Sequence, residues 1–176
     1  MTTRTLIRSA CLLSLGLALT ACVTPAPPVK APVDTTTPAQ RMAAVEAVAV
    51  GADDKELAVQ PLRDAEIEDL RMTAQVRRQA NDLPAAAEAL NQALLISEGD
   101  PSILQERAEI ALLQGDWPRA ESLARKAVDL GSKTGPLCRR HWATIEQSRL
   151  ARGQKENAAS AHAQLEGCTV PGIKRY

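Results

Sequence analysis

Residues 82–86 read Asp-Leu-Pro-Ala-Ala, and residues 116–120 read Asp-Trp-Pro-Arg-Ala, so one order of acidic, apolar, proline and alanine residues returns after 34 positions. The same offset pairs Leu70 with Leu104. A third copy begins near Leu137, where the matching positions lie 38 rather than 34 residues further on. A fixed period of this length is typical of a supersecondary unit that stacks on copies of itself.

Each unit has the pattern of a helix, a tight turn and a second helix. In the second unit, apolar residues three or four positions apart predict a helix over 102–114, which Gly115 ends. Asp116 is then a suitable N-cap for the next helix, whose first turn tolerates Pro118. The first unit has an aspartate and a proline 34 positions earlier. A helical pair of this size cannot bury its apolar face alone, so the units must stack.

The composition favours helices and excludes one class of partner. The chain has 176 residues with no Phe, two Trp and one Tyr, while Ala and Leu dominate, as in helical rather than sheet proteins. Basic and acidic residues number 21 each. Nucleic-acid binding requires a clear basic excess, so we do not expect it.

These residues resemble the tetratricopeptide repeat, which implies an all-α superhelix of about three helical hairpins over residues 63–168. The third unit departs from the family pattern at Glu146 and His162, and we expect it to be a terminal cap. A generic helical bundle is the alternative, which the fixed period disfavours. The resemblance assigns packing between the helices to Leu70, Ala74, Ala86, Leu90, Ala93, Leu104, Ala108, Ala120, Ala124, Ala127, Trp142 and Ala158.

Residues 1–21 have the parts of a secretory signal peptide. Arg4 and Arg8 precede a short apolar stretch, and the segment closes with Leu-Thr-Ala-Cys at 19–22. This ending resembles the lipobox of bacterial lipoproteins, which implies that Cys22 is lipidated and begins the mature chain. Val23 follows instead of Asp, and by resemblance to enterobacterial lipoproteins this implies the outer membrane, facing the periplasm. An ordinary signal-peptidase site and an uncleaved anchor are the alternatives.

The segments around the repeats are predicted from composition. Residues 22–40 carry five prolines among small and polar residues, which predicts a flexible linker that holds the domain up to ~50 Å from the bilayer. Residues 41–62 are an uncertain lead-in, where a short helix and a strand both stay open. Residues 169–176 form a C-terminal tail.

Cys138 and Cys168 are the cysteines outside the signal peptide and the lipidation site. Cys138 begins the first helix of the last unit, and Cys168 follows the end of its second helix. These two ends lie side by side in an antiparallel hairpin, and the periplasm is oxidising, so we predict a disulfide. No Cys-x-x-Cys motif or His/Cys cluster supports a reactive thiol pair or a zinc site.

No constellation of catalytic residues stands out. The two histidines, His141 and His162, lie on different predicted helices, and no phosphate-binding glycine loop or known catalytic motif occurs. We therefore expect no catalytic site, cofactor or metal. An envelope enzyme with an unrecognised site is the least favoured alternative.

In tetratricopeptide proteins the first helices of the units line a concave groove, and the resemblance implies a peptide-binding role. Arginines and amides there suit an extended segment, which offers carbonyls and carboxylates. The implied groove residues are Arg71, Gln75, Arg78, Gln105, Glu109, Arg140 and Gln147.

The expected function is a non-catalytic adaptor that binds segments of other envelope proteins. Known tetratricopeptide lipoproteins serve in outer-membrane protein assembly, in secretin piloting and in the control of cell-wall enzymes, and no motif here selects one. A self-associating structural lipoprotein, hence a homo-oligomer, is the first alternative. A solvated helix face without a ligand is the second.

Overall fold

The computed structural model describes residues 34–49 and 64–169. The predicted signal peptide, Cys22, most of the linker and all but the first residue of the tail lie outside these ranges.

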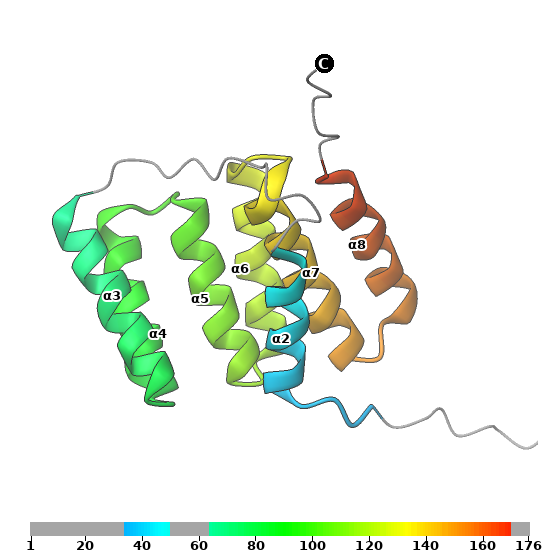
Figure 1. Cartoon of the computed structure of the whole chain (residues 1–176), viewed down its shortest axis with the longest axis horizontal. Coiled ribbons are helices and arrows are strands. Elements are labelled where there is room, and N and C mark those ends of the chain that lie inside the picture. The colour runs from blue at the N-terminus through cyan, green and yellow to red at the C-terminus, as the bar shows by residue number, and fades with distance from the viewer. Residues whose placement is uncertain (1–33, 50–63, 170–176) are drawn as a thin grey trace, which may run out of the picture. The chain divides into compact units, whose positions relative to one another are not determined.

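The regular structure of the described residues is entirely helical, and this confirms the predicted fold class (Figure 1). The three antiparallel hairpins are α3 (Ala65–Gln79) with α4 (Leu83–Ile96), α5 (Pro101–Leu113) with α6 (Trp117–Leu130), and α7 (Gly135–Ala151) with α8 (Lys155–Gly167). Each hairpin contacts the next through its second helix, since α4 packs on α5 and α6 packs on α7.

Aspartates and left-handed turns define the hairpins. The carboxylates of Asp82 and Asp116 accept hydrogen bonds from backbone N–H groups three residues on, both at 3.2 Å, which caps α4 and α6. The residue before each capping aspartate has a positive φ: 57° at Asn81 and 74° at Gly115. Gly153, the equivalent residue of the third hairpin, has a φ of 70°. The sequence period is therefore also a period of backbone conformation.

Small side chains form the contacts between the helices. Ten of the twelve predicted packing residues are buried, while Leu70 and Trp142 are partly buried and pack against the same clusters. In α6 the residues Ala120, Ala124 and Ala127 are fully buried. Because an alanine carries only a methyl group, this stripe lets α5 and α7 pack closely against α6.

An additional helix precedes the hairpins. α2 (Pro38–Ala49) begins inside the stretch predicted as linker and continues into the uncertain lead-in, so the structure moves the start of the folded part to the N-terminal side. The Thr37 hydroxyl accepts from the Gln40 backbone N–H (3.2 Å), and the Gln40 side chain accepts from the Thr37 N–H (2.9 Å). This reciprocal capping box starts the helix. Met42 and Val45 are buried where α2 packs against α7 and α5.

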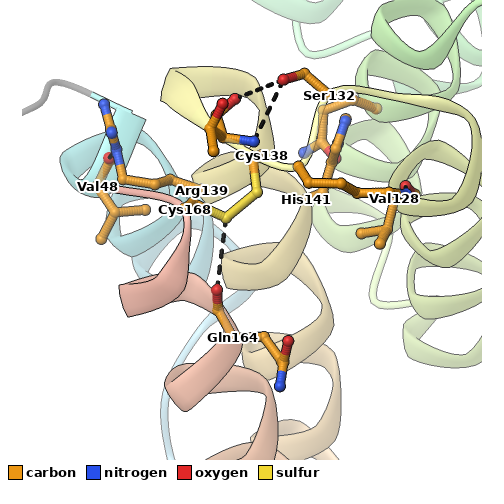
Figure 2. Close-up of a disulfide and its surroundings, with 11 residues drawn as sticks. Val48, Val128, Ser132, Cys138, Arg139, His141, Gln164 and Cys168 are labelled. Atoms are coloured by element: carbon orange, nitrogen blue, oxygen red, sulfur yellow. Dashed lines mark hydrogen bonds between the residues drawn. A yellow bond between two sulfur atoms is a disulfide. The ribbon is translucent and has the colours of Figure 1, made fainter. Parts of the chain in front are cut away.

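The structure contains the Cys138–Cys168 disulfide, with the two Cα atoms 5.7 Å apart (Figure 2). The bond joins the start of α7 to the end of α8, beside a hydrogen bond from the Gly135 N–H to the Cys168 carbonyl (2.8 Å). Arg139, next to the disulfide, donates to the carbonyl of Val48 at 2.9 Å. The last turn of α2 is therefore held by the residue that follows Cys138 in the chain.

None of the helices in the described ranges combines the length and apolarity needed to cross a bilayer.

Candidate functional site: a polar groove along the first helices

A cavity of about 380 Å³ opens over α3 and α5 and reaches the start of α7. Its wall combines charged residues with the apolar side chains of Met72, Leu90 and Ile110. Five of the seven predicted groove residues line it, and they come from all three first helices: Arg71, Gln75, Arg78, Glu109 and Arg140.

Arg71 is held between two carboxylates. Its Nη1 donates to Glu68 at 2.9 Å on the same helix, and its Nε donates to Glu106 of α5 at 3.0 Å. The hydrogen bond with Glu106 is the main cause that raises the pKa of Arg71, so the guanidinium stays charged at any physiological pH. Arg71 thus ties α3 to α5 across the cavity.

Glu109 is the buried acid of the groove, and its side chain is 2% exposed. It accepts from Arg140 Nη2 at 2.6 Å, and Arg78 Nη1 lies 3.7 Å away. Burial raises the pKa of Glu109, while the charge of Arg140 opposes that rise. The carboxylate therefore joins the cations of α3 and α7 at the floor of the cavity.

Gln105 lies beneath the floor and does not line the cavity, which corrects its predicted place in the groove. Its Nε2 donates to Glu109 (2.9 Å) and to the Thr144 hydroxyl (2.8 Å). Its Oε1 lies 2.8 Å from Nδ1 of the fully buried His141. The amide is buried because α5 and α7 close over it, and its hydrogen bonds fix the spacing of these two helices.

Gln147 is covered by α2, which corrects its predicted place as well. Arg41 of α2 donates to the Gln147 carbonyl and to its side-chain oxygen, both at 3.3 Å. Glu46, also on α2, pairs with Arg78 at 2.5 Å. α2 therefore fills the part of the groove over α7, and the open part is the cavity over α3 and α5.

Sequence reasoning missed two of the three carboxylates of the cavity. Glu68 and Glu106 line it beside the arginines, so its wall carries three cations and three carboxylates. The position of Glu68, three residues before Arg71, is a signal for an ion pair on one helix. No comparable signal exists for Glu106, since its pairing depends on how α3 and α5 stack.

The fold and the cavity define the class of protein. Helical hairpins stacked with a polar groove along their first helices form a scaffold of the kind that binds other proteins. No family model and no curated protein matches the chain, so the tetratricopeptide assignment remains a prediction from the residue pattern.

Comparison with a solved structure shows the family of the chain. The chain is similar to the globular C-terminal domain of LpoP from P. aeruginosa, with 30% sequence identity and a TM-score of 0.57. The similarity covers 60% of this chain and 99% of that one. Because it takes in nearly all of that domain at this identity, the chain belongs to the family of the LpoP C-terminal domain.

Proposed function

We propose that the protein is a lipid-anchored, non-catalytic adaptor of the bacterial envelope, which binds a segment of another envelope protein in the cavity over α3 and α5. The observation that carries this proposal is the meeting of Arg71 and Arg78 of α3 with Arg140 of α7 on one cavity. Family membership with a domain of LpoP supports the assignment.

The cavity has the chemistry of a peptide site. Its arginines are already oriented by carboxylates, so a ligand need not order them, and that lowers the entropic cost of binding. Guanidinium N–H groups suit backbone carbonyls, while Met72, Leu90 and Ile110 offer apolar contact. A short segment with one or two apolar side chains fits this combination better than a highly charged one, because the wall carries equal numbers of positive and negative groups.

The predicted lipid at Cys22 and the proline-rich linker favour one cellular role. Because α2 begins at Pro38, the predicted linker that remains could hold the domain up to ~40 Å from the bilayer, where it reaches partners that work in the periplasm. Among the roles of tetratricopeptide lipoproteins, the control of a cell-wall enzyme is the one that needs this reach most. We therefore propose an enzyme of cell-wall synthesis as the partner, with outer-membrane assembly and secretin piloting as the rivals.

Photo-crosslinking in intact cells tests the proposal. A benzophenone amino acid replaces Gln75, which is exposed and lines the cavity, and Ser160, an exposed residue of α8, serves as the matched control position. We expect position 75 to capture a cell-wall synthase that position 160 does not. Equal capture at both positions, or capture only of outer-membrane assembly or secretin components at position 75, would contradict the proposed role.

A cavity-filling variant tests the site by an independent route. Gln75→Trp places a large ring at the cavity without removing any described hydrogen bond, so the fold should persist. Binding of the captured partner should weaken by about tenfold, as expected when a contact worth roughly 1.4 kcal/mol is lost. Ser160→Trp should bind like the parent chain. Unchanged binding by Gln75→Trp would place the interaction elsewhere.

A further inference from the structure

The outer flank of α3 carries apolar side chains that no described residue covers. Met72 is 63% exposed and Val76 is 58% exposed. They lie one helical turn apart, beside Asp69, Thr73 and Arg77, and the five residues line a shallow hollow. Large apolar side chains gathered on one helix face mark an interaction surface more often than scattered ones do.

The C-terminal end of the hairpin series, at α8, has no comparable apolar flank in the described part of the chain. α3 packs mainly on α4, and α8 packs mainly on α7, so these two helices are the terminal ones. Within the described ranges, no strongly exposed large apolar side chain lies on α7 or α8. A head-to-tail contact would therefore set the apolar flank of α3 against a polar surface. A contact of α3 with α3 of a second copy covers both apolar flanks at once.

The charges on this flank are self-complementary. Asp69 and Arg77 stand four residues before and after Thr73. At a rise of 1.5 Å per residue, each lies about 6 Å along the helix from Thr73. If two antiparallel copies of α3 cross at Thr73, Asp69 of each copy faces Arg77 of the other. No such pairing arises when the two helices run parallel.

We propose that the protein forms an isologous homodimer through the outer flank of α3, with Thr73 at the two-fold axis. The contact is small, because one helix face buries less than the roughly 800 Å² per partner of a standard interface. The dimer is therefore weak in dilute solution. Anchoring of both copies in one membrane by the lipid predicted at Cys22 would raise their effective concentration and favour it.

Charge reversal gives the sharpest test, with the complete mature chain carrying Cys22→Ser so that no lipid is attached. Sedimentation equilibrium over a concentration series measures the dimer dissociation constant. Asp69→Arg and Arg77→Asp should each weaken the dimer about tenfold, because each places two pairs of like charges across the axis. The double variant restores both pairs with their order reversed, and its dissociation constant should return to within about threefold of the parent value.

Cysteine crosslinking tests the axis in the lipid-anchored chain. Thr73→Cys brings two thiols together at the two-fold axis, whereas Ser160→Cys puts an exposed thiol on α8. Non-reducing electrophoresis should show a homodimer band for Thr73→Cys and far less for Ser160→Cys.

Three results would overturn the proposal. One is a chain that stays monomeric at the highest soluble concentration while Thr73→Cys crosslinks no faster than the control. Another is a dimer that the double charge reversal does not restore. The third is a Thr73→Cys product that joins a different protein or another part of the same chain.

Discussion

Acid should unfold this domain through His141. The ring belongs to α7 and is fully buried. Its Nδ1 donates to the side-chain oxygen of Gln105, because the side-chain nitrogen of Gln105 donates to Glu109 instead. The other ring nitrogen, Nε2, is buried without a partner among the described residues. Burial, helped by the positive charges of Arg140 and Lys133, lowers the pKa of His141 to about 4.

The size of the effect follows from the difference between the two states. The pKa of the unfolded state is near 6.5, and that of the folded state is about 4. Above pH 6.5 both states are neutral. Between pH 6.5 and pH 4 the imidazole of His141 is protonated in the unfolded chain but stays neutral in the folded chain. The free energy of unfolding therefore falls as the pH falls. The limiting loss is about 3 kcal/mol, of which about 2 kcal/mol is lost by pH 5.

Urea unfolding at pH 7 and pH 5 measures this loss. His141→Gln keeps a hydrogen-bonding side chain that does not titrate, and His162→Gln is the matched control at an exposed position. Between the two pH values the parent chain and His162→Gln should lose about 2 kcal/mol more than His141→Gln. The raised pKa of Glu109 changes the free energy of unfolding in the opposite direction as the pH falls, but this contribution is common to all three chains. An equal loss in His141→Gln and the parent chain would refute this account of His141.

Three further perturbations test the packing. Ala120→Asp places a charge at a fully buried position and should lower the free energy of unfolding by more than about 4 kcal/mol. Ala159→Asp, at an exposed position, should change it by less than about 0.5 kcal/mol. A melting curve of Ala120→Asp by circular dichroism that matches the parent chain would show that the assigned register is wrong. Replacing Cys138 and Cys168 together by Ser should lower the free energy of unfolding in urea by roughly 3 to 4 kcal/mol, because a loop of 30 residues is no longer closed. Arg139→Ala removes the donor to the end of α2 and should speed amide exchange in residues 38–49 by about tenfold, with α5 unchanged as the internal control.

The repeat was predictable because its signals are local. The aspartate before α4 and before α6, the proline in the first turn of each helix and the residue with positive φ before the aspartate all act within a few positions. The positive φ recurs at Asn81, Gly115 and Gly153, as the sequence offsets imply, whereas the N-cap of α8 is Gln154, whose side chain makes no capping hydrogen bond. Burial of Ala120, Ala124 and Ala127 also follows from their helical spacing, whereas the alanines of the first and third units were assigned by the resemblance. Local chemistry of this kind does not depend on how the hairpins stack.

The start of α2 was missed because the prolines of residues 22–40 predict a flexible linker, while the rest of the helix falls in the lead-in where a helix and a strand both stay open. Pro38 is the first residue of the helix, a position that lacks an intrahelical N–H bond in any case. The Thr37-Pro38-Ala39-Gln40 sequence has the spacing of a capping box and could have revealed the start of the helix. No local pattern predicts where α2 packs, because Arg41 donates its hydrogen bond to Gln147, more than a hundred residues away in the chain.

The ion pairs of the cavity differ in how readily a ligand could exchange them. Glu109 is 2% exposed, so removing Arg140 from it would leave a buried carboxylate without compensation, at a cost of several kcal/mol. Glu68 is 46% exposed beside Arg71, and water can replace that bond at little cost. A carboxylate on a bound segment should therefore displace Glu68 and pair with Arg71, while Glu109 keeps its arginines and fixes the floor. In the proposed function, the open end of the cavity over α3 is therefore the part that recognises a partner, and the end toward α7 supports the fold.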